Sequence, residues 1–387
     1  MIMSHPAPTL TWDIFCNVID NYGDIGVAWR LARQLRHEHD QRIRLWVDDL
    51  SSFARMCPAL DSACPRQMLD DIEVRVWPDP FPEGIEPAEV ILDAFGCQLP
   101  DSFLAAMAEN QPAPLWINLE YLSAEAWVEG CHGMVSPHPR LPLKRHFFFP
   151  GFSQGTGGVI AEQGLDARVR AWQQDNVAQD AFWKTLGVPA RQPHERRISL
   201  FSYENPDIGE LLHSWASGSQ PVRCLVPEGR ILADITAGFS QRALGAGDTI
   251  EQGALTLHVI PFTDQDRYDR LLWSCDFNFV RGEDSFMRAQ WARRPFIWHI
   301  YPQRDSAHWV KLEAFWQRYT LGLSPAARQA VLAANHAWNH EQGISASWKL
   351  LESHLPELQT FAARWPHTLL AHGDLVSRLQ RFIEQQR

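Results

Sequence analysis

The sequence of 387 residues lacks a long apolar run, a cluster of basic residues and any CxxC pair. It contains 35 Lys and Arg against 46 Asp and Glu, which gives a net charge of −11 at neutral pH. Binding to a phosphate backbone requires clustered cations, so we expect no nucleic-acid partner. No stretch reaches the roughly 18 apolar residues that span a bilayer, so we expect no membrane partner. The first ten residues do not place a basic segment before an apolar one, so we expect no signal peptide.

The seven cysteines are scattered, without the spacing of a disulfide framework or a zinc site. Such thiols are typical of the reducing cytosol, so we expect a cytoplasmic protein. His336 and His340 lie four residues apart on an expected helix, but the segment has no HExxH pattern and no third ligand close by. The sequence therefore predicts neither a metal site nor a cofactor.

Hydrophobic periodicity predicts strands that alternate with helices along most of the chain. The first half is expected to contain a helix over 27–38 and strands at 11–18, 42–47, 72–77, 89–93, 114–118 and 131–136. The proline- and glycine-rich segment 137–158 is expected to be a long loop, and 161–186 to be helical. Expected strands of the second half are 197–203, 222–227, 256–262, 276–280 and 295–300.

This alternation is typical of parallel sheets that are covered by helices on both faces. Because the length favours two domains, we expect an α/β fold with two facing Rossmann-like domains and a ligand cleft between them. The polar segment 189–197 indicates the boundary. We expect an N-terminal Rossmann-like domain over 1–185 and a C-terminal Rossmann-like domain over 186–387.

The first candidate site is the segment Asp20–Gly26, which lies between the first strand and the first helix. In a doubly wound sheet this loop lies at the edge where ligands bind. Asp20 and Asp24, separated by a glycine, can converge on one point. The alternative is that Asp24 only caps the helix and Asp20 only belongs to a turn. The segment is not GxGxxG, which disfavours a dehydrogenase.

The second candidate site, Phe279–Phe286, follows a strand and opens a helix. Backbone N–H groups at a helix start suit a diphosphate, and Arg281 could add a charged hydrogen bond. Glu283 would repel a phosphate but could bind a ribose hydroxyl. The alternative is that Glu283, Asp284 and Ser285 are ordinary residues of a first helical turn.

Two further segments could contact a nucleotide. Phe262 and Gln265 could stack on a base and hydrogen-bond to it, although such a Phe is more often part of the core. Tyr203 ends an expected strand and could donate to a phosphate. The glycine-rich segment Gly151–Gly158 is not a P-loop, because no Lys-Ser or Lys-Thr follows it.

Five segments make the sequence resemble the EarP family, the protein-arginine rhamnosyltransferases of bacterial elongation factor P. These are DIFCNVIDNYGDIGVAWRLARQL, ILDAFGCQLP, WINLEYLSAE, FFFPGF with TGG, and FNFVRGEDSFMRAQWA. The resemblance implies a GT-B fold with an acceptor-binding domain over 1–185 and a nucleotide-sugar-binding domain over 186–387. The final helix, about 365–387, would return to the N-terminal domain. The same resemblance implies an inverting, metal-independent transfer of rhamnose from dTDP-β-L-rhamnose to an arginine of elongation factor P. The modified factor would be active in the rescue of ribosomes stalled at polyproline.

The resemblance also implies roles for individual residues. Asp20, Asp24 and Glu283 match the positions that are critical in the family, and Asn21, Tyr22 and Gly23 are candidates for contact with the acceptor. Expected donor-binding residues are Phe201, Tyr203, Phe262, Gln265, Arg281, Asp284, Ser285 and Phe286.

A carboxylate pair suits an arginine acceptor, because it can orient the guanidinium and take its proton. We expect Asp24 to be the base and Asp20 to orient the acceptor. One alternative is another GT-B sugar-nucleotide transferase, or an epimerase, with a small-molecule acceptor. A nucleotide-binding or factor-binding module without turnover is a second alternative, although mere binding does not need a convergent base.

Overall fold

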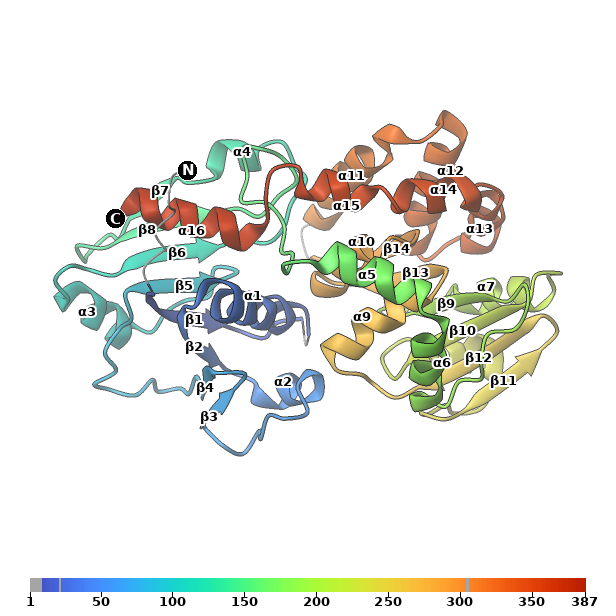
Figure 1. Ribbon diagram of the computed structural model, residues 1–387, viewed down its shortest axis with the longest axis horizontal. Helices are drawn as coiled ribbons and strands as arrows, with labels where there is room; N and C mark the ends of the chain where they lie inside the picture. The colour runs from blue at the N-terminus through green and yellow to red at the C-terminus, as the bar shows by residue number, and fades with distance from the viewer. Residues whose placement is uncertain (1–8, 21, 304–305) are drawn as a thin grey trace. The chain divides into compact units, whose positions relative to one another are not determined.

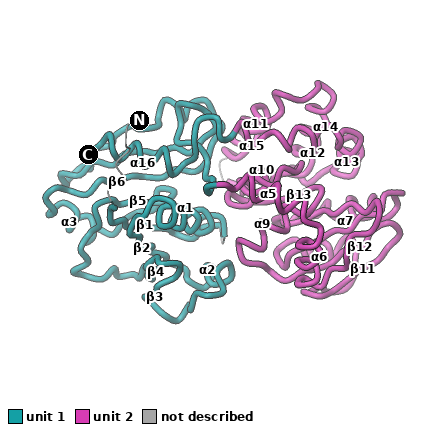
Figure 2. The backbone as a smooth tube through the Cα atoms, viewed as in Figure 1, with its two compact units in different colours: residues 1–163, 369–387 teal, residues 164–368 magenta. Residues whose placement is uncertain are grey.

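The computed structural model describes residues 9–20, 22–303 and 306–387. These residues fold into two compact α/β units (Figures 1 and 2). None of the helices in this described part is long and apolar enough to cross a membrane. Unit 1 consists of Met1–Gln163 and Leu369–Arg387, and unit 2 consists of Gly164–Thr368.

Unit 1 is built on a sheet whose described strands have the order β3-β4-β2-β1-β5-β6-β8-β7. The pairs β3–β4 and β7–β8 at the two edges are antiparallel, and the strands between them pair in parallel. All residues of β5, and all but the first of β1, are buried, as expected for a sheet covered on both faces. The strands are β1 (Thr11–Cys16), β2 (Arg42–Val47), β3 (Arg66–Leu69), β4 (Ile72–Val76), β5 (Val90–Ala94), β6 (Leu115–Leu119), β7 (Val135–Pro137) and β8 (Lys144–Phe148).

Alternate strand residues of unit 1 point into an aromatic core. Phe15 of β1, Trp46 of β2 and Trp116 of β6 pack with Phe103 and Met107 of a helix. The Phe15 and Trp46 rings stack with centroids 5.7 Å apart. The helices of this unit are α1 (Gly23–His39), α2 (Leu50–Met56), α3 (Asp101–Glu109), α4 (Val128–Cys131) and the final α16 (Leu375–Gln386).

The final helix α16 belongs to unit 1, although all of unit 2 lies between this helix and the first part of unit 1 in the sequence (Figure 2). The Gln34 amide of α1 donates to Asp374, the residue that precedes α16, over 3.2 Å. The Phe382 ring of α16 lies 5.6 Å from the Phe148 ring of β8. These contacts explain why the last residues of the chain join the sheet formed by its first part.

Unit 2 contains a second sheet, with the order β11-β12-β10-β9-β13-β14 among its described strands. Only β11 is antiparallel to its neighbour within the described residues. The strands are β9 (Arg196–Leu200), β10 (Val222–Pro227), β11 (Thr249–Gln252), β12 (Leu255–Ile260), β13 (Phe277–Arg281) and β14 (Phe296–His299).

Helices cover both faces of the second sheet. On one face, Trp183 and Leu271 of two helices pack on Leu225 of β10 and Ile260 of β12. On the other face, Phe279 of β13 contacts the rings of Trp215, Trp338 and Trp348. The helices are α5 (Leu165–Gln174), α6 (Asn176–Thr185), α7 (Ile208–Ala216), α8 (Leu232–Ile235), α9 (Gln265–Ser274), α10 (Asp284–Trp291), α11 (Ala307–Tyr319), α12 (Pro325–Asn339), α13 (Ile344–Ser353), α14 (Leu355–Ala362) and α15 (Trp365–Leu370).

The division between the units differs from the expected boundary at residues 185 and 186. Helices α5 and α6 belong to unit 2, so the first part of unit 1 ends at Gln163. Trp183 of α6 is 1% exposed in the core of unit 2, and Asp166 of α5 forms an ion pair with Arg293 over 2.5 Å. The helical stretch before the polar segment is therefore packed against the second sheet and is not the end of the first domain.

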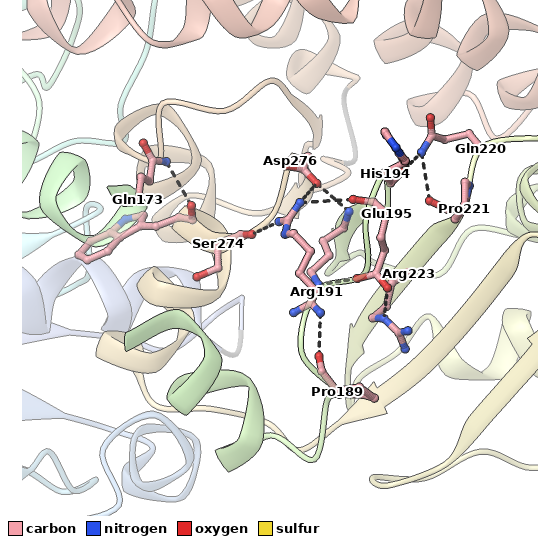
Figure 3. A network of polar contacts seen from close by, with 12 residues as sticks. Gln173, Pro189, Arg191, His194, Glu195, Gln220, Pro221, Arg223, Ser274 and Asp276 are labelled. Carbon is pink, nitrogen blue, oxygen red and sulfur yellow. Dashed lines mark hydrogen bonds and ion pairs between the residues drawn. The ribbon is translucent and has the colours of Figure 1, made fainter. Parts of the chain in front are cut away.

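The polar segment 189–197, which we expected to mark the domain boundary, instead lies inside unit 2, where a network of charges holds it (Figure 3). Arg191 donates to Asp276 over 2.7 Å, and the same carboxylate accepts the backbone N–H of Arg197. Glu195 bridges two buried guanidinium groups, those of Arg197 at 2.7 Å and Arg223 at 2.8 Å. Burial lowers the pKa of Arg197, and the adjacent Glu195 opposes that shift. The charges of this segment are therefore paired inside the unit, partly with Asp276 and Arg223 from outside the segment.

Several expected elements differ from the observed ones. The expected loop 137–158 contains the five-residue strand β8, four residues of which pair in parallel with β6. The expected strand 131–136 is observed only at its end, because α4 extends to Cys131 and the strand β7 covers Val135–Pro137. The expected strand 197–203 ends at Leu200, so Phe201 and Tyr203 lie in the loop that follows it.

We expect Glu195→Gln to lower the free energy of unfolding by about 3 kcal/mol, because it leaves two buried guanidinium groups without their shared carboxylate. Urea unfolding at pH 7 measures this change. Glu251→Gln removes an exposed carboxylate from the edge strand β11 and should change stability by less than about 0.5 kcal/mol. Equal effects of the two substitutions would show that Glu195 does not stabilise the unit.

Candidate functional site

The two sheets share a topological feature that positions the candidate residues. In unit 1, β1 lies between β2 and β5, and in unit 2, β9 lies between β10 and β13. The chain leaves each central strand toward one side of the sheet and later returns to the other side. Loops that follow the two strands at such a point diverge and leave space for a ligand. Asp20 and Asp24 follow β1, whereas the predicted donor-binding residues follow β9, β12 and β13.

Asp24 lies in the first turn of α1, and its carboxylate turns back toward the preceding loop. One oxygen, Oδ2, accepts the backbone N–H groups of Ile19 at 2.9 Å and Asp20 at 3.0 Å. The other oxygen, Oδ1, accepts the hydroxyl of Tyr121 at 3.0 Å. The side chain is only 2% exposed. The alternative that Asp24 is the helix cap is wrong, because Tyr22 occupies the cap position.

The loop before α1 exposes Asp20 more than Asp24. Asp20 is partly exposed, and its carbonyl accepts the backbone N–H of Gly23 at 2.8 Å, which closes the turn into the helix. The Tyr22 ring lies 5.7 Å from the guanidinium carbon of Arg55. The structure therefore brings Asp20 and Tyr22 of this loop together with Gly23 and Asp24 of the first helical turn, whereas the candidate Asn21 lies outside the described residues.

Residues that were not predicted support this loop from the neighbouring strands. Asp48, which follows β2, accepts the Asn17 amide at 2.8 Å and the Val18 backbone N–H at 2.9 Å. Tyr121, which follows β6, stacks on Phe95 with centroids 4.4 Å apart. Phe95 and Tyr121 occur in two of the segments that carry the family resemblance, ILDAFGCQLP and WINLEYLSAE. Their position directly after expected strands was the signal in the sequence that could have identified them.

In unit 2, aromatic rings hold the guanidinium of Arg281. Its central carbon lies 4.6 Å from the ring centroid of Phe201 and 4.6 Å from that of Tyr203, which is within the range of cation–π contacts. Arg281 is 6% exposed. The Ser285 hydroxyl accepts the Arg281 backbone N–H at 3.1 Å and donates to the Arg281 carbonyl. Gly282 between them has a φ of +65°, which a side chain rarely adopts.

The donor-binding candidates on α9 and α10 also meet. Gln265, the first residue of α9, donates to Asp284, the first residue of α10, over 3.3 Å. Both side chains are buried. The Phe262 ring is partly exposed and lies 6.4 Å from the ring of Phe201.

Glu283 occupies the cap position of α10, and its carboxylate pairs with Lys311 of α11 over 3.2 Å. The two side chains are 11% and 16% exposed, so this ion pair is mostly removed from water. The role of Lys311 could not be predicted from the sequence, because 28 residues separate it from Glu283 and it belongs to an ordinary amphipathic helix.

Phe286 differs from the other donor-binding candidates, because its ring is part of the core. It is 1% exposed and stacks on Trp298 with centroids 3.8 Å apart. His299 is an unpredicted neighbour of the site, and its Nδ1 lies 2.8 Å from the hydroxyl of Ser202. Burial, followed by the charge of Arg281, lowers the pKa of His299 to about 3, so this imidazole is neutral at pH 7.

Within the residues that the structure describes, no group of three or more His, Cys, Asp or Glu side chains is arranged to hold a metal ion. His336 and His340, the spaced pair on α12, have ring centroids 4.0 Å apart. The His340 ring stacks on Trp309 of α11 at 3.9 Å. These two side chains therefore make aromatic contacts between helices.

Comparison with known proteins was made for the whole chain. The model of the elongation factor P rhamnosyltransferase family EarP matches residues 12–384. A protein-arginine rhamnosyltransferase of Pseudomonas putida is 50% identical over 372 residues, which cover 96% of this chain and 98% of the relative.

Solved structures agree with this result. One, described as the structural basis for EarP-mediated arginine glycosylation of translation elongation factor EF-P, has a TM-score of 0.71 at 38% identity and covers 98% of this chain and 100% of that one. MurG of Acinetobacter baumannii has a TM-score of 0.51 at 10% identity, covers 98% of this chain and 100% of its own, and is similar in fold alone.

The expected α/β class with a GT-B fold is confirmed by these structures. The family model spans nearly the whole chain, and the expected resemblance is therefore also confirmed. This chain belongs to the EarP family of elongation factor P rhamnosyltransferases.

Proposed function

We propose that this chain transfers rhamnose from dTDP-β-L-rhamnose to one arginine side chain of translation elongation factor P, with inversion and without a metal ion. Family membership supports the reaction class, and the acceptor of the EarP enzyme of known structure supports the choice of acceptor. The observation that carries the proposal is the pair of carboxylates, Asp20 and Asp24, on the loop between β1 and α1. We further propose that the modification activates the factor for rescue of ribosomes stalled at polyproline.

The carboxylate pair fits the chemistry of an arginine acceptor. A guanidinium stays protonated, and its delocalised nitrogens are poor nucleophiles. One carboxylate can bind its planar fork while another accepts a proton as the new bond forms. We assign the base to Asp24, which three hydrogen bonds hold in one position, and the orienting role to the more exposed Asp20. Asn21, Tyr22 and Gly23 would complete the acceptor side of this loop.

The transfer step balances without a further reactant. A guanidinium nitrogen forms a bond to C1 of rhamnose, and the bond between C1 and the diphosphate oxygen breaks. The electron pair of the broken bond stays on the departing dTDP, and the nitrogen loses its proton to Asp24. An ordinary carboxylate is too weak a base to deprotonate a free guanidinium, so proton transfer must accompany formation of the C–N bond.

Unit 2 offers groups that suit the leaving dTDP. The N-terminus of α10, at Asp284 and Ser285, is a positive helix end where a diphosphate is favoured. Arg281, held between Phe201 and Tyr203, would add a charged hydrogen bond that strengthens as negative charge builds on the diphosphate.

Phe262 and Gln265 suit the base of the nucleotide, through stacking and a hydrogen bond. Glu283 suits a sugar hydroxyl, and the adjacent Lys311 offsets the repulsion between this carboxylate and the diphosphate. Phe286, whose ring is packed in the core, would support the start of the helix from behind.

Incubation of the protein with dTDP-β-L-rhamnose should raise the intact mass of elongation factor P by one deoxyhexose, in the presence of EDTA as well as without it. Asp24→Asn should abolish this gain, whereas calorimetry should still detect binding of the donor. Asp101→Asn, an exposed substitution on α3, is the matched control and should retain full activity. An unchanged mass with the unmodified enzyme would refute the proposed function, and turnover by Asp24→Asn would remove Asp24 as the base.

Tyr121→Phe should lower kcat roughly 10-fold, because it removes a hydrogen bond to a charged group that is worth about 1.5–3 kcal/mol. Asp24 keeps its two backbone hydrogen bonds, so the loop should stay folded. The KM for dTDP-rhamnose should not change, since the donor residues lie in unit 2. Tyr319→Phe removes another buried hydroxyl, in the core of unit 2, and should leave kcat unchanged. A wild-type kcat for Tyr121→Phe would show that this bond does not serve catalysis.

Lys311→Met should lower kcat/KM for the donor at least 10-fold, because loss of one partner of a mostly buried ion pair costs about 2–5 kcal/mol. Lys311→Arg keeps the charge and should retain more activity. Steady-state kinetics with varied dTDP-rhamnose measure both variants. If Lys311→Met binds and uses the donor normally, then the ion pair with Glu283 is only structural.

A further inference from the structure

A pocket of about 660 Å3 lies within unit 1, at the carboxyl ends of four neighbouring parallel strands. Such a volume is typical of ligand-binding pockets. Each strand contributes a residue that directly follows it. These residues are Asn17 after β1, Asp48 after β2, Trp77 after β4 and Phe95 after β5.

The walls of this pocket are aromatic and firmly packed. Trp77 and Phe81 line it and also pack against the core of unit 1. The Trp77 ring meets the buried Phe15 ring edge-on at 5.2 Å, and the Phe81 ring lies 5.0 Å from that of Trp46. An occupant would therefore meet a preformed apolar surface.

The charged lining residues are Asp48 and Asp79, both exposed, and none of the described residues that line the pocket is Lys, Arg or His. Asp48 is held in place by Asn17 and Val18. Two carboxylates disfavour a nucleotide or any other anion. They favour a side chain with an apolar stem and a cationic end, which can lie along aromatic rings and pair with a carboxylate.

The pocket is continuous with the loop that carries the catalytic carboxylates. Ile19 lines the pocket, is 66% exposed and directly precedes Asp20. Phe95 lines it from the other side with a φ of +61°, an uncommon conformation for a bulky residue. The Phe95 ring stacks on Tyr121, which donates to Asp24. An occupant would therefore contact Ile19, the neighbour of Asp20, and Phe95, which packs on the tyrosine that binds Asp24.

From this placement we propose that the pocket binds a basic side chain of the acceptor protein that lies close to the target arginine. The inference rests on the proposed function, and it assigns the acceptor a second anchoring point. One basic side chain enters the pocket between Asp79 and the aromatic walls, while the target guanidinium meets Asp20 and Asp24.

Asp79→Lys should raise the KM for elongation factor P about 10-fold, with kcat at saturating acceptor and the KM for dTDP-rhamnose within two-fold of the unmodified enzyme. Asp79→Asn should have an intermediate effect. Glu109→Lys reverses an exposed charge at the far end of α3 and is the matched control for a general change in net charge. Initial rates are measured by intact mass, with each substrate varied in turn.

A reciprocal exchange identifies the occupant. Each basic residue near the target arginine of the acceptor is replaced by Glu, and one of these variants should react faster with Asp79→Lys than with the unmodified enzyme. If Asp79→Lys and Glu109→Lys raise the acceptor KM equally, or if no acceptor variant is rescued, the pocket does not anchor the acceptor. If the unmodified enzyme leaves the acceptor mass unchanged, both this inference and the proposed function fail.

Discussion

The hydrogen bonds of the Asp24 carboxylate are the constraint on which the candidate site depends. A buried carboxylate is costly unless donors surround it, and here two backbone N–H groups and one phenol meet this need. The same bonds fix the backbone at Ile19 and Asp20, so the position of the second carboxylate follows from that of the first. Tyr121 links this loop to β6, which lies two strands away in the sheet. The geometry of the site therefore depends on residues that follow several strands of the sheet, and not on the loop after β1 alone.

Unit 2 uses the same local device after β13, the neighbour of its central strand β9. Asp24 and Ser285 are each the second residue of the helix that follows a strand at the topological switch point. Each accepts the backbone N–H of the residue four positions earlier, which is Asp20 in one unit and Arg281 in the other. In both units, a short polar side chain at a helix start therefore holds the backbone of a charged residue that precedes the helix, which is Asp20 or Arg281.

The sequence predicts the periodic parts of this fold well and its long-range contacts poorly. The expected strands 42–47 and 222–227 match β2 and β10, because their apolar runs are bounded by clear turns. Strand β8 was missed, since prolines and glycines around it resemble a loop. The polar segment 189–197 was mistaken for the domain boundary, because the residues that pair with its charges, such as Asp276 and Arg223, are distant in the sequence. The candidates Asp20, Asp24 and Glu283 follow from motifs, whereas the pairing of Tyr121 with Asp24 and of Lys311 with Glu283 does not, because the partners are 97 and 28 residues apart.

The distribution of charge gives each unit a chemical preference. The unit 1 site presents Asp20 and Asp24 on one loop, and the adjacent pocket adds Asp48 and Asp79. Such a surface attracts a cationic segment and repels a nucleotide. In unit 2, the charge of Arg281 and the N-terminus of α10 provide a positive end for a diphosphate. In a chain with a net charge of −11, the proposed anionic donor and cationic acceptor would thus each meet a suitable charge, because the two preferences reside on different sheets.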